Sequence, residues 1–462
     1  MADEQIGATI ESGPSDWQVL QQDQDGYACI TVSGRWVSPE SGKVEVRLVY
    51  EATGMPVGRG LDWQAAATTP DGGWAATLVR APAGGLYRLE TRYNPRANLA
   101  GEWSARGDMR HFLGVGDLWV IAGQSNSAGY GKGPAFDPPE LGVHLLRNSG
   151  SWALAAHPLN DSTATQHPAN REAANPVHSP YLHYARTLKR CLNHPIGLVQ
   201  AALGGSPLSA WNPTEPGGAV LFHNMVRCVE CAGGRVKGVL WYQGESDADA
   251  VNGPTYAARF IRAVGAWRAA LHDPELPVIT VQLNRYYTPS TESLDLGWSL
   301  VREAQRQAPR MLPGVYVVPA LDLPLGDLIH TSATGNMLLA ERMANVALGA
   351  VYHRPVDYLA PEPASSRRSG DGRTVEIAFQ PVASRMDNPD LTTSCFRVED
   401  DLGEVPVEKV VYPGQTTVQL VLGRELSGVA LVHGAPGLNP PPAPMDMERL
   451  MPMLGFYGFP VQ

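Results

Sequence analysis

The chain has 462 residues, enough for two to four domains of roughly 100–200 residues each. Its formal net charge of −10 argues against a nucleic-acid partner or an anionic membrane, because neither attracts an acidic surface. Only 18% of the residues are charged and 48 are glycine, a composition typical of a turn-rich globular protein with much β structure. No apolar run approaches the roughly 18 residues that a membrane span requires.

The start of the chain and its cysteines indicate a reducing compartment. The first seven residues, Met-Ala-Asp-Glu-Gln-Ile-Gly, have neither the positive charge nor the apolar run of a secretory signal. The cysteines are scattered, and the pair Cys228 and Cys231 lacks the second ligand pair of a zinc site. We therefore expect a cytoplasmic protein with free thiols and no bound metal. The five cysteines are Cys29, Cys191, Cys228, Cys231 and Cys395.

Two terminal segments, residues 1–112 and 355–462, alternate between polar and apolar residues as β-strands do. Val44–Leu48 is a clear case in the first segment, and Val375–Phe379 is one in the second. Each segment predicts a small all-β sandwich domain. The second ends in a proline-rich tail from Gly434 onward, which we expect to pack as an extended strap.

Residues 113–354 change to an alternation of short apolar runs with helical stretches. This order predicts a parallel sheet with helices on both faces, the three-layer α/β/α class. The apolar runs are Leu118–Ala122, Ile196–Gln200, Val236–Tyr242, Pro277–Leu283 and Val315–Pro319. The helical stretches are Tyr181–Arg190, Tyr256–Leu271, Leu300–Gln307 and Met337–Ala350.

Ser125 follows the first of these apolar runs. The run stops at Gly123, so the serine lies on a glycine-flanked turn at the carboxyl edge of the predicted sheet. Open α/β sheets place their chemistry at this edge, and a serine there can act as a nucleophile. Taken alone, the segment is equally compatible with an ordinary strand end.

Asp327-Leu-Ile-His330 follows the last apolar run and precedes a helical stretch. An aspartate three residues before a histidine can reach the imidazole Nδ1, which is how a carboxylate orients a catalytic base. In isolation this spacing is more often a surface turn. Its place at the end of a strand puts it on the same sheet edge as Ser125.

Two further segments at strand ends can supply hydrogen-bond donors for an oxyanion. Ala202-Leu-Gly204-Gly205-Ser206 offers backbone N–H groups without obstructing side chains, and Trp241-Tyr-Gln243-Gly244-Glu245-Ser246-Asp247 offers a glutamine amide. The alternative interpretation is that Gly204 and Gly205 only form a turn and that Gln243 is an ordinary polar loop residue.

These four segments, in this order, resemble the four blocks of the SGNH hydrolase superfamily, and more narrowly its sialate O-acetylesterase and acetylxylan esterase branch. The resemblance covers most of the chain and implies a flavodoxin-like catalytic domain at 113–354 between the two β-domains. Neither Gly123-Gln-Ser125 nor Gly244-Glu-Ser246 is completed by the last glycine of G-x-S-x-G, which argues against the α/β-hydrolase fold.

The resemblance also implies the roles of single residues. Ser125 matches the nucleophile, His330 the general base and Asp327 the acid that orients it. Ser125, Gly205 and Gln243 match the oxyanion hole, although the superfamily at large has asparagine where Gln243 stands. Four more residues are expected to support the site, and the last of them is the rival orienting acid: Gln124, Asn126, Gly204 and Glu245.

The implied reaction is removal of an O-acetyl group from a carbohydrate through an acetyl-Ser125 intermediate, with no metal or cofactor. O-acetylated sialic acid is the favoured substrate and acetylated xylan fragments are the alternative; Trp211 offers a face for sugar stacking. A sialate esterase also needs an arginine for the sugar carboxylate, for which Arg147, Arg171 and Arg285 are candidates. A catalytically silent carbohydrate-binding protein and a lipid or thioester hydrolase are the competing hypotheses.

Overall fold

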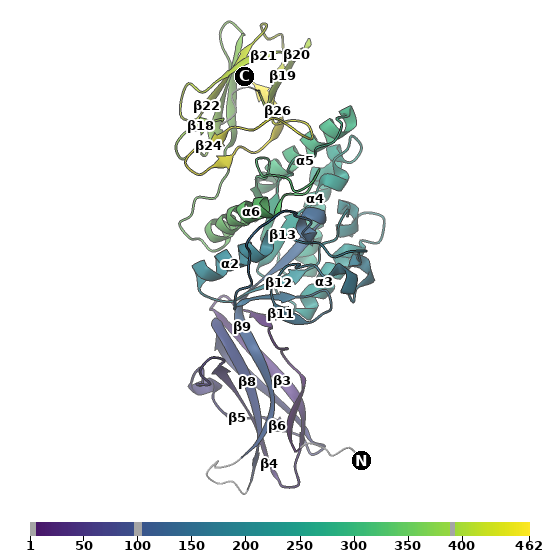
Figure 1. Ribbon diagram of the computed structural model, residues 1–462, viewed down its shortest axis with the longest axis vertical. Coiled ribbons are helices and arrows are strands. Elements are labelled where there is room, and N and C mark those ends of the chain that lie inside the picture. Colours follow the sequence, from purple (N-terminus) through teal and green to yellow (C-terminus); the bar gives the residue numbers. More distant parts are fainter. Residues whose placement is uncertain (1–5, 97–103, 389–392) are drawn as a thin grey trace.

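The computed structural model describes residues 6–96, 104–388 and 393–462. Figure 1 shows three parts stacked along the longest axis of the molecule: N-terminal strands, a central region with helices, and C-terminal strands. In the described residues, no helix has both the length and the apolar character needed to span a bilayer.

The central region is built on a parallel sheet that contains all five expected strands. Counted along the chain, these strands lie in the spatial order 2-1-3-4-5, and every neighbouring pair among them is parallel. In that spatial order they are β12 (Ile196–Gln200), β9 (Ala105–Gly123), β13 (Gly238–Tyr242), β14 (Val278–Val281) and β15 (Val315–Val318). The carboxyl ends of these strands therefore meet at one edge, as the sequence predicts.

Two strands that the sequence analysis missed extend the sheet beyond β12. They are β10 (Val143–Leu146), parallel to β12, and β11 (Trp152–Leu154), antiparallel to β10.

The helices form two groups. In one, α2 (Tyr181–Leu192) contacts α6 (Ala333–Val346); in the other, α4 (Tyr256–Ala270) lies between α3 (Val220–Cys231) and α5 (Glu292–Met311). The two groups lie on opposite sides of the sheet in Figure 1.

Strand β9 belongs to both the N-terminal part and the central sheet. Its first half pairs with β8 (Gly84–Pro95) and with β2 (Val19–Gln21), and its second half pairs with β12 and β13. The boundary expected between residues 112 and 113 therefore falls inside one continuous strand, which joins the two parts.

Both terminal parts consist of strands around their own hydrophobic clusters. Besides β2, β8 and β9, the N-terminal strands are β1 (Gly7–Ser12), β3 (Tyr27–Val37), β4 (Gly42–Tyr50), β5 (Gln64–Ala65), β6 (Ala67–Thr68) and β7 (Gly73–Pro82). The C-terminal strands are β16 (Glu362–Arg368), β17 (Thr374–Gln380), β18 (Met386–Asp387), β19 (Phe396–Asp400), β20 (Gly403–Val405), β21 (Val407–Val411), β22 (Thr417–Leu422), β23 (Ala430–Gly434), β24 (Met445–Asp446), β25 (Met451–Pro452) and β26 (Phe456–Val461).

The proline-rich tail packs against the central region. Fully buried Arg302 on α5 donates hydrogen bonds to the carbonyls of Gly437 and Leu438, and the Gly437 N–H donates to Ser299 Oγ at 2.7 Å. Farther along, Gln282 at the end of β14 exchanges two hydrogen bonds with the backbone of Gly455. The tail thus fastens the C-terminal strands to the helix and strand that they cover.

Candidate active site

Ser125 is the first residue of a four-residue helix, α1 (Ser125–Ala128), that begins directly after β9. The turn depends on Gly123, whose φ is +122° and where a Cβ atom would lie 2.2 Å from the Tyr242 carbonyl oxygen. Only glycine permits this approach of β9 to β13. The half-buried Ser125 is thereby placed at the carboxyl edge of the sheet.

Asp327 and His330 contact each other on the loop between β15 and α6. The His330 Nδ1 lies 3.0 and 2.9 Å from the two carboxylate oxygens of Asp327. Partial burial opposes ionisation of Asp327. Hydrogen bonds from the His330 ring, from the backbone N–H groups of His330 and Ile329, and from Lys132 nevertheless hold its pKa well below the usual range. A fixed carboxylate at Nδ1 leaves Nε2 to face a substrate.

Asn126 connects the turn that carries Ser125 (the serine turn, residues 123–126) to the loop that carries Asp327 and His330 (the histidine loop, residues 327–331). Its Oδ1 accepts the Thr331 N–H at 2.9 Å, and its Nδ2 donates to the Ile329 carbonyl at 3.4 Å. Because Ile329 and Thr331 flank His330, the residue after Ser125 positions the histidine loop. The expected supporting place of Asn126 at the site agrees with this geometry.

The Ser125 hydroxyl and the His330 Nε2 make no hydrogen bond to each other or to any other described residue. Tyr130 stacks on the His330 ring with the ring centres 5.2 Å apart. Catalytic hydrogen bonds often tighten only in the complex with substrate, so this arrangement is compatible with a serine–histidine pair.

Backbone N–H groups of Ser125 and Gly205 are free to receive an oxyanion. Within the described residues neither has a hydrogen-bond acceptor; Gly205 is exposed, with φ +65° and open space where a Cβ would stand. The loop of Gly205 is held beside Ser125, since the Leu203 N–H donates to the Gly123 carbonyl at 3.1 Å. Gly204 is not free, because its N–H donates to Glu172 Oε1 at 2.7 Å.

Gln243 does not offer a third donor. It is fully buried, and its Nε2 donates to the Ser206 carbonyl at 3.3 Å and to Asp247 Oδ2 at 2.6 Å. Both amide hydrogens are therefore used inside the protein. Our expectation that Gln243 faces the oxyanion is wrong for this conformation, in which the side chain instead connects two loops of the site.

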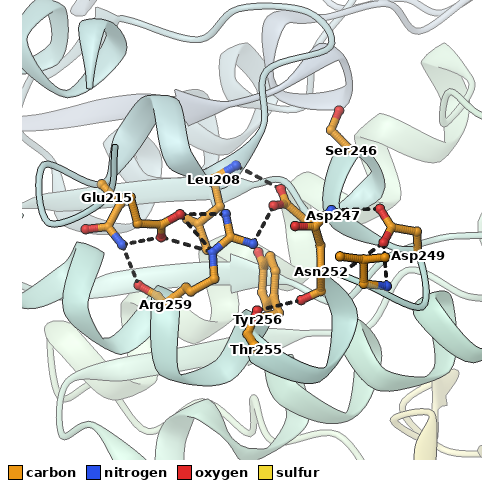
Figure 2. A network of polar contacts seen from close by, with 12 residues as sticks. Leu208, Glu215, Ser246, Asp247, Asp249, Asn252, Thr255, Tyr256 and Arg259 are labelled. Atoms are coloured by element: carbon orange, nitrogen blue, oxygen red, sulfur yellow. Dashed lines mark hydrogen bonds and ion pairs between the residues drawn. The ribbon is translucent and has the colours of Figure 1, made fainter. Parts of the chain in front are cut away.

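Asp247 is a positioning residue that the sequence analysis did not single out. Besides Gln243, its carboxylate accepts the Leu208 N–H at 2.8 Å and Arg259 Nη1 at 2.8 Å. In Figure 2, dashed lines join Asp247 to Leu208, in the segment after β12, and to Arg259, on helix α4, whereas Ser246 stands apart from these contacts. This network anchors the segment that carries Gly205. The sequence around Asp247 does not indicate that its carboxylate is paired with Arg259.

Gln124, like Asp247, connects two segments of the site. Its side-chain Oε1 accepts the Ser246 N–H at 3.1 Å, so it ties the serine turn to the loop after β13.

Glu245 contacts Asn126 rather than His330. Its Oε1 accepts from Asn126 Nδ2 at 2.7 Å, whereas its Oε2 is buried without a hydrogen-bond partner among the described residues. Burial raises the pKa of Glu245 to about 7. Of the two candidate orienting acids, only Asp327 touches the imidazole.

The pKa of Glu245 predicts a pH dependence of stability. The unfolded value is near 4.5, so between pH 4.5 and 7 the folded state binds more protons and the free energy of unfolding falls as pH rises. At one unit per 1.36 kcal/mol, the loss is about 3 kcal/mol by pH 8. Denaturation of wild type and Glu245→Gln at pH 5, 6 and 8 should show the variant gaining stability relative to wild type as pH rises. Glu230→Gln, at an exposed position on α3, is the control, and parallel wild-type and Glu245→Gln curves would contradict the prediction.

Trp211 is not available to a sugar. It is 0% exposed, packs edge-on against Trp241 and donates from Nε1 to Ser206 Oγ at 3.0 Å. The expectation that it stacks on substrate is therefore wrong. An exposed aromatic ring lies instead at Tyr287, 65% exposed, whose N–H donates to the Leu328 carbonyl inside the histidine loop. No motif marks that tyrosine.

The three candidate arginines differ in their surroundings. Arg147 forms an ion pair with Asp161 at 2.7 Å, and half-buried Arg285 donates to the Leu323 carbonyl. Arg171 is exposed, and its side chain bonds only to the Thr165 carbonyl among described groups. It directly precedes Glu172, the residue that contacts Gly204. It is the candidate whose charge is free near the site.

Comparisons with known proteins agree with this architecture. The sequence model described as "Carbohydrate esterase, sialic acid-specific acetylesterase" matches residues 115–349, more than half of the chain. The chain is 30% identical over 256 residues to the probable carbohydrate esterase At4g34215 of Arabidopsis thaliana, a match that covers 50% of this chain and 90% of that protein. The crystal structure of XAC1771, a carbohydrate acetylesterase from Xanthomonas citri, shares the fold with a TM-score of 0.67 at 22% identity, over 97% of this chain and 99% of that one. The chain therefore belongs to the carbohydrate esterase, sialic acid-specific acetylesterase family and is a carboxylic ester hydrolase.

Proposed function

We propose that this esterase removes O-acetyl groups from a sugar with Ser125 as nucleophile, His330 as general base and Asp327 as orienting acid. The observation that carries the proposal is the Asp327–His330 contact, fixed by Asn126 against the turn of Ser125. No metal or cofactor takes part in this chemistry.

In this mechanism Ser125 Oγ attacks the acetyl carbonyl while His330 Nε2 accepts its proton. Asp327 keeps the other imidazole proton on Nδ1 and stabilises the imidazolium. The carbonyl oxygen becomes an oxyanion between the N–H groups of Ser125 and Gly205, each worth about 3 kcal/mol in the transition state. His330 returns the proton to the sugar oxygen, which leaves as an alcohol. Water, deprotonated by His330, then cleaves the acetyl-enzyme to acetate.

We further propose that residues 113–354 form a flavodoxin-like SGNH domain and that 1–112 and 355–462 are β-sandwich domains. The strand order 2-1-3-4-5 supports the first assignment, since it is the flavodoxin-like order. Separate hydrophobic clusters in the terminal parts support the second.

The proposed substrate is O-acetylated sialic acid, recognised through its carboxylate by Arg171. Two observations support this choice: the family match, and the exposed Arg171 side chain, which forms no ion pair with a carboxylate among the described residues. Glu172 favours a second candidate, a neutral acetylated xylo-oligosaccharide. Its Oε2 is buried without a partner among the described residues and can accept a sugar hydroxyl.

Acetate release from O-acetylated sialic acid and from acetylated xylo-oligosaccharides tests the substrate. We expect a higher kcat/KM for O-acetylated sialic acid. Arg171→Met should raise the KM for this substrate about tenfold or more, because one charge-assisted hydrogen-bonded pair is lost. The same variant should leave turnover of p-nitrophenyl acetate unchanged, as should the control Arg262→Met, at an exposed position on α4. A clear preference for the neutral substrate would replace sialic acid by the second candidate and leave the serine mechanism standing.

A further inference from the structure

A cluster of histidine and aspartate side chains lies outside the proposed catalytic groups. Asp137 Oδ2 is 3.0 Å from His157 Nε2 and 3.7 Å from His178 Nε2, and one ligand atom from each residue lies within 4.8 Å of the others. The three residues come from separate parts of the chain. Their convergence is therefore a property of the fold and not of a local motif.

The cluster is largely buried, with the His157 side chain 16% exposed, and it is incompletely hydrogen-bonded. The Asp137 side chain is 1% exposed and that of His178 is 8% exposed, and His178 Nε2 has no hydrogen-bond partner among the described residues. Asn336 Nδ2 lies 3.4 Å from His178 Nδ1 but donates at 3.0 Å to the His178 carbonyl, so the longer contact does not set the tautomer.

The surroundings resemble the outer shell of a metal site. Arg186 Nη1 donates to the other carboxylate oxygen of Asp137 at 2.6 Å, which leaves Oδ2 for the histidines. His183 lies 3.7 Å from that same Oδ1 and is held at 2.5 Å by Glu341. Glu341 occupies Nε2 of His183, and the contact of His183 with Asp137 is to the Oδ1 that Arg186 already bonds. Metal-bound carboxylates commonly have such partners on their second oxygen.

We propose that Asp137 Oδ2, His157 Nε2 and His178 Nε2 bind a zinc ion whose fourth ligand is water. Zinc takes imidazole and carboxylate ligands at about 2.0–2.1 Å in tetrahedral geometry, which separates ligand atoms by about 3.4 Å. The distances of 3.0 and 3.7 Å from Asp137 Oδ2 lie on either side of that value. The His157 and His178 rings stack with their centres 4.1 Å apart, so the two imidazoles would have to turn for both Nε2 lone pairs to point at one ion.

The place of the cluster gives the ion a structural role at the active site. The His178 carbonyl accepts the Gly131 N–H at 3.0 Å, and the Val177 N–H donates to the Gly129 carbonyl at 2.8 Å. The two hydrogen bonds hold Gly129 and Gly131, the residues on either side of Tyr130, and Tyr130 stacks on His330. Zinc at His178 would thus stabilise the segment that follows the Ser125 helix, without entering the acyl-transfer steps.

The test measures metal content and stability, so its result does not depend on the proposed reaction. The full chain is stripped with a chelator, dialysed against zinc and then against metal-free buffer, and assayed by mass spectrometry of its metal. We expect about one zinc per chain. We also expect a melting temperature about 5 °C higher at zinc a hundredfold above its Kd than in the stripped protein. Less than a tenth of an equivalent, with no shift in melting temperature, would overturn the proposal.

Variants locate the ion. His157→Gln and His178→Ala should lose zinc binding and the zinc-dependent stabilisation, whereas His223→Ala, at an exposed position on α3, should keep both. Zinc retained by either folded cluster variant would overturn the assignment. X-ray absorption of zinc in the wild-type protein covers the case in which both variants fail to fold. Two imidazole ligands without sulfur support the cluster, and sulfur ligands, as from Cys228 and Cys231, overturn it.

Discussion

Replacement of Ser125 by alanine is expected to lower kcat on an acetylated sugar by at least about 10⁴-fold, the scale seen when a serine nucleophile is removed. The Ser125 hydroxyl makes no hydrogen bond to a described residue, so its loss should leave folding and melting temperature unchanged. Initial rates of acetate release, together with thermal denaturation, check both parts of the expectation.

Ser246→Ala is the matched control for that substitution. Ser246 is exposed in Gly244-Glu245-Ser246, the other segment that resembles a nucleophile turn, and it should keep near wild-type activity. Mass spectrometry of quenched wild-type enzyme should find the acetyl group on Ser125. If Ser125→Ala kept more than a tenth of the activity, or if the acetyl group were found on Ser246, the nucleophile would have been misassigned.

Strands β12, β9, β13, β14 and β15 could be predicted because each is rich in apolar residues where it crosses the central sheet, and all but β15 are buried there on both faces. Strands β10 and β11, which extend the sheet beyond β12, could not. His144 interrupts the apolar residues of β10, and β11 has only three residues, so neither shows a clear pattern; β10 is held by pairing with β12 and β11 by pairing with β10. The polar first half of β9 was likewise missed, since its strand conformation depends on β8, which lies earlier in the chain.

The candidate site divides in the same way between local and long-range information. The contact of Asp327 with His330 follows from a spacing of three residues, and the place of Ser125 follows from a strand that ends at glycine. Gln243 and Trp211 were misjudged because their directions also depend on groups far away in the sequence, the Ser206 carbonyl for Gln243 and the Trp241 ring for Trp211. Asp247 takes the amide of Gln243, and Ser206 takes the indole N–H of Trp211.

The second large effect is expected from Asp327→Asn, which should lower kcat by about 10³–10⁴-fold. The asparagine oxygen can still accept the N–H groups of Ile329 and His330 that now bond to Asp327 Oδ1, so the loop should keep its shape. Its amide would then donate to His330 Nδ1. That donation leaves the imidazole proton on Nε2, the atom that must accept the proton of Ser125, and the base is blocked.

Glu245→Gln decides between the two acids. Glu245 touches Asn126 and not the imidazole, so an isosteric amide there should change kcat by less than about tenfold, the scale of one lost neutral hydrogen bond. Both variants are compared under saturating substrate, with circular dichroism to confirm folding. The opposite ranking, with Glu245→Gln inactive and Asp327→Asn active, would mean that the orienting carboxylate reaches His330 from the loop after β13. The serine and the histidine would keep their roles. The Asp327–His330 contact would then only stabilise the loop, because replacing a true orienting acid by an amide reverses the tautomer of its histidine and abolishes the base.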